Sequence, residues 1–112
     1  MTKTSYVCLP CRASYKQAYD PLDRTRERHC PRCARALIQL GSAFAAPRRR
    51  DTAGWRTLSV LVNAGVRFHK RGSGDGGAGY RPRTLGEVRE RMAFARRTGE
   101  PFARSLVRRE LP

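Results

Sequence analysis

The sequence has few acidic residues, few lysines and no long hydrophobic run. Its 112 residues include 9 Asp and Glu against 24 Lys and Arg, and all the basic residues except Lys3, Lys16 and Lys70 are arginines. No stretch approaches the roughly 20 apolar residues that a membrane-spanning helix needs, so no membrane partner is predicted. The polar residues 1–5 are not followed by an apolar run, so no secretory signal is predicted and we expect a cytoplasmic protein.

The sequence also lacks the residue groupings that are typical of catalytic sites. Of its two histidines, His29 neighbours Cys30 and could only be a spare metal ligand or a surface residue, and His69 has no evident nucleophile or carboxylate partner. Segment 72–79 matches the dinucleotide-binding glycine pattern, but its glycines are so frequent that they would match almost any such pattern. Neither a helix start nor a Lys-Ser/Thr pair follows the segment. We therefore expect a non-enzymatic protein with no small-molecule substrate.

Cysteine is confined to one arrangement. The four cysteines form two C-x2-C pairs separated by eighteen residues, Cys8, Cys11, Cys30 and Cys33. This spacing is typical of a four-thiolate metal site, and a reducing cytosol favours metal ligation over disulfides. Four thiolates complete a tetrahedron, so the expected cofactor is one structural zinc ion. Iron is the alternative, because such cysteine turns bind either metal.

The residues around the cysteines predict short strands. Residues 5–7 lead into the first pair, and residues 13–19 alternate between side chains that would face inward and outward. A turn is predicted at 20–23, around Pro21, and a charged return segment at 24–28. Residues 36–40 form a predicted final strand that ends at Gly41.

Residues 6–40 resemble a zinc ribbon, the family in which two C-x2-C knuckles on β-hairpins hold one zinc ion. The chain departs from the commonest pattern because Arg12 and Ala34 follow the knuckles, where glycine is frequent. The whole chain is also similar to small basic zinc-ribbon proteins of actinobacteria, a likeness that implies no particular activity.

The remainder of the chain predicts helices. Asp51 or Thr52 can cap a helix over 53–64 that Gly65 would end, although a strand over 58–62 is an alternative. Thr84 and Glu87 form a capping box for a second helix that runs to about residue 98. A short last helix is predicted over 102–109.

The second helix carries an apolar stripe, which we expect to face the core, and charged residues around it. The stripe consists of Leu85, Val88, Met92 and Ala95, and Arg89 and Arg96 flank it. Glu87 and Arg91 are expected to pair across one turn on the far side. Phe94 points away from the stripe and is expected to pack on another element.

These elements together predict an α+β fold. Residues 1–41 would form the zinc ribbon. Residues 42–112 would form an Arg-rich linker and a helical C-terminal region, with a flexible glycine loop at 72–79.

The net charge of +15 points to a polyanionic partner. The excess is spread evenly, because residues 1–40, 41–80 and 81–112 carry 8, 7 and 9 basic and 3, 2 and 4 acidic residues, which is +5 each. We expect nucleic acid, with RNA or the ribosome preferred to DNA. An acidic protein such as a polymerase or another enzyme is the alternative partner.

Arginines are the expected phosphate ligands, because the guanidinium group binds phosphate through two hydrogen bonds and also stacks on bases. Tyr15 and Tyr19 could stack on bases or pack across strands. The candidate nucleic-acid-binding residues are Arg12, Lys16, Arg24, Arg26, Arg28, Arg32 and Arg35 in the ribbon and Arg48, Arg49 and Arg50 in the linker.

Overall fold

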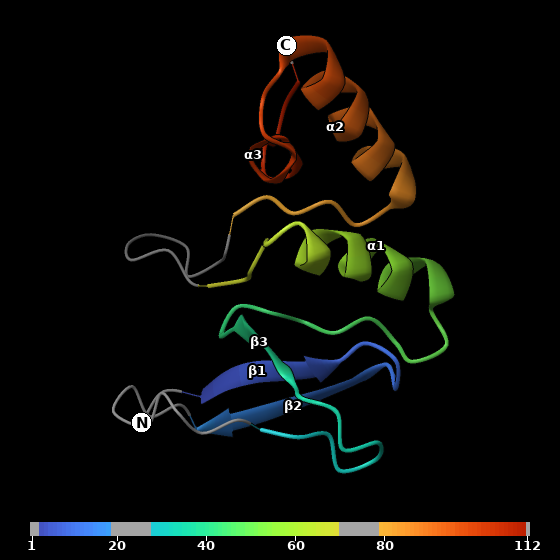
Figure 1. Cartoon of the computed structure of the whole chain (residues 1–112), viewed down its shortest axis with the longest axis vertical. Coiled ribbons are helices and arrows are strands. Elements are labelled where there is room, and N and C mark those ends of the chain that lie inside the picture. The colour runs from blue at the N-terminus through green and yellow to red at the C-terminus, as the bar shows by residue number, and fades with distance from the viewer. Residues whose placement is uncertain (1–2, 19–27, 70–78, 112) are drawn as a thin grey trace. The chain divides into compact units, whose positions relative to one another are not determined.

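The computed structural model of the chain describes residues 3–18, 28–69 and 79–111. It contains three strands followed by three helices (Figure 1). Their bounds are β1 Lys3–Cys8, β2 Ala13–Ala18, β3 Ile38–Gly41, α1 Thr52–Asn63, α2 Leu85–Thr98 and α3 Phe102–Leu106. The predicted α+β class is confirmed.

The three strands form one antiparallel sheet with β1 in the middle, in the order β2-β1-β3. The β1–β2 register runs from Lys3 opposite Ala18 to Cys8 opposite Ala13, so the first C-x2-C segment closes this hairpin. β1 is buried from Thr4 onward, whereas β2 alternates between half-buried and exposed residues, as its sequence pattern predicted. The sheet therefore ends at the first cysteine pair.

Strand β3 ends where another segment approaches its backbone. The Phe68 amide donates to the Leu40 carbonyl at 2.6 Å, and the Ala43 amide donates to the Phe68 carbonyl at 3.0 Å. Gly41 has a φ of +114°, and a Cβ at this position would lie 2.5 Å from the Phe68 carbonyl oxygen. The predicted strand end at Gly41 thus reflects both its backbone angle and this close approach. Phe44 packs edge-on against Phe68, with ring centroids 5.1 Å apart.

Helix α1 begins and ends at the predicted signals. The Asp51 carboxylate accepts a hydrogen bond from the Gly54 amide at 2.9 Å, and Gly65 follows the helix with a φ of +89°. The strand alternative over 58–62 is wrong, because these residues are helical. The buried residues of α1 share one broad face, Trp55, Thr57, Leu58, Leu61 and Val62.

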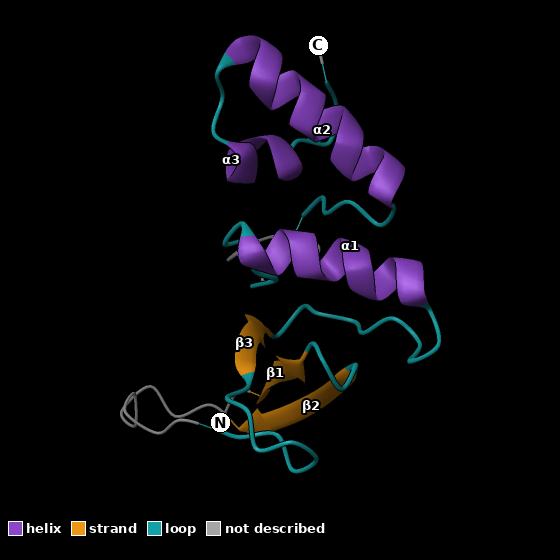
Figure 2. Ribbon diagram, turned by 45° about the vertical axis from the view of Figure 1, so that its right-hand side comes forward, coloured by secondary structure: helices purple, strands orange, loops and turns teal. Residues whose placement is uncertain are grey.

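Helix α2 also has the predicted caps. The Thr84 hydroxyl accepts a hydrogen bond from the Glu87 amide at 3.2 Å, and Gly99 ends the helix in a left-handed conformation. Helix α3 contacts α2 after a short turn, as both ribbon views show (Figure 2). It is shorter than predicted, because Val107 no longer continues the helix.

The buried face of α2 differs from the predicted apolar stripe. Its buried residues are Val88, Arg91 and Phe94, whereas Leu85, Met92 and Ala95 are half-buried. Phe94 is packed, as expected. Arg91 pairs with Glu90 at 3.4 Å, and the predicted Glu87–Arg91 pair is replaced by a contact from Arg91 to the Glu87 carbonyl.

The inward position of Arg91 follows from the carbonyl groups that it reaches. Its guanidinium donates to the carbonyl of Arg108 at 3.0 Å and to that of Arg109 at 3.1 Å, and it stacks 4.6 Å from the centroid of the Tyr80 ring. These carbonyls lie after the end of α3, so no helical N–H group donates a hydrogen bond to them. Arg91 therefore ties the end of the chain to α2.

Tyr80 and Glu87 are linked in the segment that leads into α2. The Tyr80 hydroxyl donates to Glu87, and burial together with this hydrogen bond raises the pKa of Tyr80 to about 12. The same hydrogen bond, with those from the Arg83 amide and the Thr84 hydroxyl, lowers the pKa of Glu87. The folded chain therefore stabilises the ionised form of Glu87 and the neutral form of Tyr80.

The chain divides into two compact units. The first, which we call the sheet unit, comprises residues 1–46 and 68–77; the second, the helical unit, comprises 47–67 and 78–112. Four sequence expectations lie wholly or mainly outside the described residues: Tyr19, the turn at 20–23, most of the return segment 24–28, and the glycine loop except Gly79. Within the described ranges, no helix is both long enough and apolar enough to cross a membrane.

Candidate metal centre

The first cysteine pair lies at the turn of the β1–β2 hairpin. Cys8 is the last residue of β1, and the Arg12 amide closes the turn by donating to the Leu9 carbonyl at 3.2 Å. Arg12 has a φ of +50°, a left-handed conformation that side chains other than glycine rarely adopt. The turn places Cys8 and Cys11 on the same end of the sheet.

The second pair lies in a loop with a different hydrogen-bond pattern but the same left-handed residue after its second cysteine. His29, before the pair, and Ala36, after it, form a β-bridge that joins the two ends of the loop. Within the loop, the Ala34 amide donates to the Cys30 carbonyl at 2.8 Å. Ala34 has a φ of +62°, so both residues that follow the cysteine pairs are left-handed. These are the two positions at which the sequence departs from the glycine that is frequent in zinc ribbons. The structure therefore keeps the turn conformation although neither residue is glycine.

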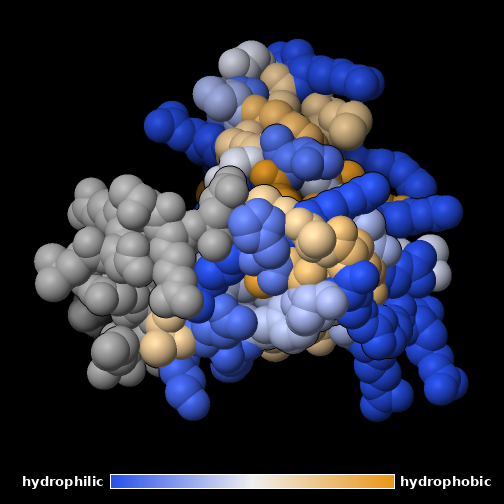
Figure 3. Space-filling view, turned by 60° about the horizontal axis from the view of Figure 1, so that its bottom comes forward, coloured by the Kyte–Doolittle hydropathy of each residue, from blue (hydrophilic) through white to orange (hydrophobic). Residues whose placement is uncertain are grey.

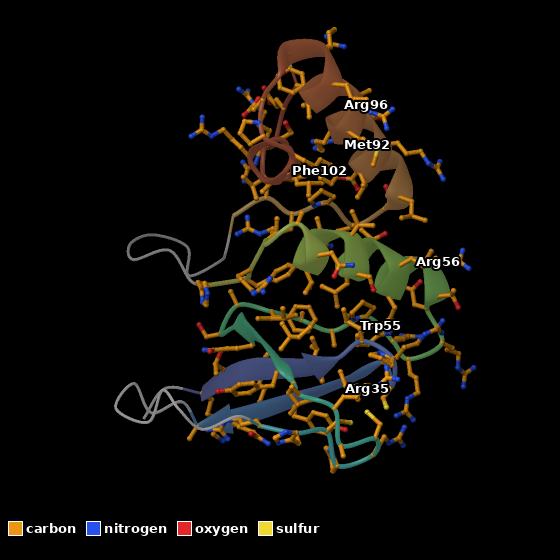
Figure 4. The ribbon with its side chains drawn as sticks, viewed as in Figure 1. Arg35, Trp55, Arg56, Met92, Arg96 and Phe102 are labelled. Atoms are coloured by element: carbon orange, nitrogen blue, oxygen red, sulfur yellow. The ribbon has the colours of Figure 1, made fainter. Side chains whose placement is uncertain are left out.

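The two pairs bring all four sulfur atoms together. The Sγ atoms of Cys8, Cys11, Cys30 and Cys33 all lie within 4.8 Å of one another, and the Cys8 and Cys33 sulfurs are 3.5 Å apart. A tetrahedral site with metal–sulfur bonds of ~2.3 Å needs sulfurs about 3.8 Å apart, so this cluster could hold one metal ion. None of the four is in a disulfide. Figure 4 shows the sulfur atoms (yellow) at the end of the sheet where Arg35 lies.

As free thiols, Cys8, Cys11 and Cys30 have pKa values that are shifted in different directions. Burial raises the pKa of Cys30, but the backbone amides of Arg32 and Cys33 donate to its sulfur and lower the pKa to about 6 overall. A hydrogen bond to Cys33 and partial desolvation raise the pKa of Cys11 to about 12. Burial likewise raises the pKa of Cys8. Four crowded thiolates repel one another, and a bound cation would offset that repulsion.

Tyr15 lies against the cluster. It stands opposite Tyr6 in the β1–β2 register, and its hydroxyl is 3.9 Å from the Cys30 sulfur. Its place in the register is compatible with the expected cross-strand packing, and its expected alternative role in base stacking stays a prediction. The hydroxyl contact with sulfur was not predicted, although the period-two pattern of β2 places Tyr15 on the same face as Ala13 and Gln17. Such a contact around metal ligands orients them.

The candidate arginines of the ribbon have different surroundings. Arg28 is half-buried, and its guanidinium donates to the Gln17 side chain and to the Ala18 carbonyl, and lies 4.9 Å from the centroid of the Tyr6 ring. It therefore holds β2 to the segment that enters the second pair. Arg12 is half-buried, whereas Lys16, Arg32 and Arg35 are exposed. Arg24 and Arg26 lie outside the described residues.

The arginines of the expected linker, Arg48, Arg49 and Arg50, form an ordered turn of the helical unit. The Arg48 carbonyl accepts hydrogen bonds from the Asp51 amide at 2.9 Å and from the Trp55 indole at 2.9 Å, and the Thr52 amide donates to the Arg50 carbonyl at 3.0 Å. All three side chains are exposed. We call this segment the tri-arginine turn.

Exposed polar side chains cover much of the visible surface. In Figure 3, hydrophilic side chains project outward around patches of apolar ones. The candidate arginines predicted from the sequence lie in the ribbon and in the tri-arginine turn, whereas Arg89 and Arg96 of α2 were noted only as flanking its apolar stripe. The seven-residue spacing of Arg89 and Arg96 was the available signal for that surface.

No family model, curated protein or solved structure matches the chain. The geometry itself defines the class of site: a cluster of four cysteines on a small antiparallel sheet, consistent with a zinc-ribbon-like metal centre.

Proposed function

We propose that the chain is a non-enzymatic, zinc-ribbon-like protein that binds nucleic acid, with RNA preferred. The observation that carries the metal part is the convergence of four sulfur atoms within 4.8 Å. Four thiolates and a tetrahedral separation suit zinc, and the same four ligands leave no open position for a substrate or a reactive water. The ion would therefore fix the two cysteine turns to each other.

Metal analysis of the purified protein tests this assignment. We expect one zinc per chain, retained on dialysis and released when the cysteines are blocked. Iron in place of zinc would colour the protein, because thiolate-to-iron charge transfer absorbs visible light. The site would then be assigned to a redox-active metal ion instead of zinc. A protein purified under reducing conditions that takes up neither metal would contradict the proposal.

The nucleic-acid part is supported by the tri-arginine turn. Its backbone is held by hydrogen bonds from Asp51 and Trp55, so three exposed guanidinium groups start from a fixed base. Preorganised arginines lose less conformational entropy when they bind phosphate than arginines on a flexible linker would. Residues 48–51 comprise three arginines and Asp51, so this segment carries a formal charge of +2.

RNA is the proposed ligand because basic side chains are exposed on both compact units. In the sheet unit these include Lys16, Arg32 and Arg35, and in the helical unit the tri-arginine turn. A folded RNA can offer phosphates to several surfaces of one small protein. Helix α3, which follows α2 after a short turn, has only five residues, so we do not propose that it reads the major groove of DNA, and sequence-specific duplex binding is not proposed.

The salt dependence of RNA binding tests the phosphate contacts. Affinity for a labelled, structured RNA should fall steeply with salt, and the slope of log K against log[salt] should drop by about 0.7–0.9 for each phosphate contact removed. Replacing Arg48, Arg49 and Arg50 together by glutamine should therefore lower the slope by about 2.1–2.7. The matched control replaces Arg83, Arg104 and Arg109 together by glutamine, the same change in charge at exposed positions elsewhere in the helical unit.

The two triple variants separate a specific contact from a general charge effect. A larger loss with the tri-arginine variant, equal for RNAs of different sequence, supports the proposal. Binding that is flat between low and physiological salt would refute it. Capture of partners from lysate with and without nuclease gives the second test, since nuclease-resistant capture of an acidic protein would point to an adaptor instead.

A further inference from the structure

Helix α2 carries a solvent-exposed face opposite its buried side. The buried side consists of Val88, Arg91 and Phe94. We call the exposed side the α2 outer face, and it is formed by Gly86, Arg89, Glu90, Ala93, Arg96 and Arg97. Nothing in the metal centre or the tri-arginine turn involves these residues.

Two arginines run along one edge of this face. Arg89 and Arg96 are seven residues apart, so they lie two helical turns and about 10.5 Å apart on the same side of α2. The Arg96 guanidinium is 3.6 Å from the Met92 sulfur, and Figure 4 shows both side chains along one side of the helix. This contact directs the Arg96 stem along α2 and leaves its charge at the surface.

A third arginine stands on the opposite edge. The Arg97 guanidinium lies 5.5 Å from the centroid of the Phe94 ring, which rests in the core beneath it. Between the two edges lie Gly86, which has no side chain, and Ala93, whose side chain is a single methyl group. The α2 outer face is thus a strip of small residues with arginines on both edges, and Glu90 shares the edge of Arg97.

The acidic residues of α2 do little to neutralise this strip. Glu87 is bound to Tyr80, Thr84 and the Arg83 amide, away from the face. Glu90 lies on the face with 68% of its side chain exposed, and it pairs with Arg91 at 3.4 Å. No described carboxylate pairs with Arg89, Arg96 or Arg97.

We propose that the α2 outer face is a second phosphate-binding surface, which seats the backbone of an RNA duplex along the strip between its arginine edges. The inference rests on the proposed nucleic-acid function and adds to it a particular surface. The small residues let the backbone approach the helix, and the arginines on either side meet phosphates with paired hydrogen bonds. The charge complementarity is strongest for a polyanion with regularly spaced phosphates.

The test compares two double variants on the full chain. Arg89→Gln with Arg96→Gln removes one edge of the face, and Arg104→Gln with Arg109→Gln removes the same charge from exposed positions outside it. Anisotropy of a labelled RNA duplex of mixed sequence gives affinity and salt slope. We expect the face variant to lose about tenfold or more in affinity near 0.1 M salt and to lower the slope by about 1.8, and the control to change the slope by less than half as much.

A single substitution tests the strip itself. Ala93→Glu places a negative charge between the arginine edges and should weaken duplex binding, whereas Ala93→Gln, of equal size, should weaken it less. Helical circular dichroism and Trp55 fluorescence check that each variant is folded. Position 93 is exposed, and glutamate and glutamine are both good helix formers, so each variant should fold.

The outcomes are distinguishable. Equal losses in the two double variants would overturn the second surface while leaving the proposed function in place. A wild-type protein that binds no nucleic acid would overturn both. If the face variant kept its affinity for RNA but lost nuclease-resistant capture of an acidic protein, the face would be a protein contact and the inference would be wrong.

Discussion

The buried side chains of the two compact units differ in kind. Among the described residues of the sheet unit, the buried apolar side chains are few, and two of them are cysteines of the four-cysteine cluster: Tyr6, Val7, Cys8, Cys30, Leu40 and Phe44. In the helical unit they are more numerous and none is a cysteine: Trp55, Leu58, Leu61, Val62, Val66, Val88, Phe94 and Leu106. Burying such a side chain contributes about 1.5–3 kcal/mol, so the two units have unequal apolar support.

A short chain can therefore support two compact units by different chemistry. The sheet unit has a small core and, at the end of its sheet, a cluster of four cysteines that could hold a metal ion; small cores of this kind usually need a metal. The helical unit relies on helix caps and on Arg91, whose guanidinium binds the carbonyls that follow α3. The first unit should therefore depend on metal and the second should not.

Removal of the metal should have the largest effect and should be confined to the sheet unit. Structural zinc contributes about 10–16 kcal/mol in small zinc domains, far more than the sheet core can replace. With a strong chelator, we expect the amide signals of residues 3–18 and 28–41 to lose their dispersion. The fluorescence of Trp55, the only tryptophan of the sequence, should change little because it lies in the helical unit.

Cys33→Ser should reproduce the effect of the chelator, because three thiolates bind zinc more weakly than four. Ser14→Ala, an exposed change on β2, serves as the control and should leave the metal content unchanged. Loss of both units in one cooperative transition would break the comparison, since it would mean that the helical unit also depends on metal.

Arg91→Met should have the next largest effect and should be confined to the helical unit. The variant keeps the apolar stem but leaves the carbonyls of Arg108 and Arg109 without their donor, at a cost of about 2–4 kcal/mol. Urea unfolding followed by helical circular dichroism gives the difference in the free energy of unfolding. The metal content should not change.

Arg89→Met is the matched control on the same helix. Arg89 is exposed, so its replacement should alter the free energy of unfolding by less than about 0.5 kcal/mol. Equal losses for the two variants would show that Arg91 acts through its charge alone, and that the carbonyl contacts add nothing to the helical unit.

Much of the sheet unit could be predicted from the sequence, because its determinants are local. The cysteine spacing places both turns, and the period-two pattern of β2 places its faces. The approach of Phe68 to Gly41 could not be predicted, since it joins residues far apart in the chain by backbone hydrogen bonds that leave no mark on the side-chain pattern.

The helical unit shows where local patterns mislead. Helix ends followed from Asp51, Thr84, Gly65 and Gly99, because capping depends on neighbouring residues. The buried face of α2 did not follow, because hydrophobicity alone would expose Arg91. Its burial depends on the carbonyls after α3, a tertiary partner that the sequence of α2 does not contain.

The Tyr80–Glu87 pair should make the stability of the helical unit depend on pH, with a smaller effect. The pKa of Glu87 is lowered on folding, so its contribution is present above the unfolded value of about 4.3 and is lost as pH falls through the folded value. The pKa of Tyr80 is raised to about 12, so its contribution is present below about pH 10 and is lost as pH rises toward 12.

The free energy of unfolding measured against pH checks this pair. Glu87→Gln should flatten the acid side of the profile, and Tyr80→Phe should flatten the alkaline side; each should cost about 0.5–1.5 kcal/mol at neutral pH. An unchanged acid limb in Glu87→Gln would assign that limb to other carboxylates, such as Glu100, which binds Arg108 at 2.9 Å.

The smallest expected effect is a gain in stability at the two left-handed residues of the sheet unit. Arg12 and Ala34 have φ values of +50° and +62°, which cost a residue with a Cβ about 1–2 kcal/mol. Glycine removes this cost but loses more entropy on folding, so Ala34→Gly should stabilise the unit by about 0.5 kcal/mol. A higher midpoint in chelator titration of the metal would measure the gain.

Ala36→Gly sharpens this result, because Ala36 lies two residues further on, in an extended bridge with His29 and without a positive φ. There glycine only adds flexibility to the unfolded chain, and the sheet unit should lose about 0.5–1 kcal/mol. Opposite signs at positions 34 and 36 would show that the turn conformation, and not the loss of a methyl group, sets the effect. The same sign at both would mean that the left-handed turn costs the metal centre nothing.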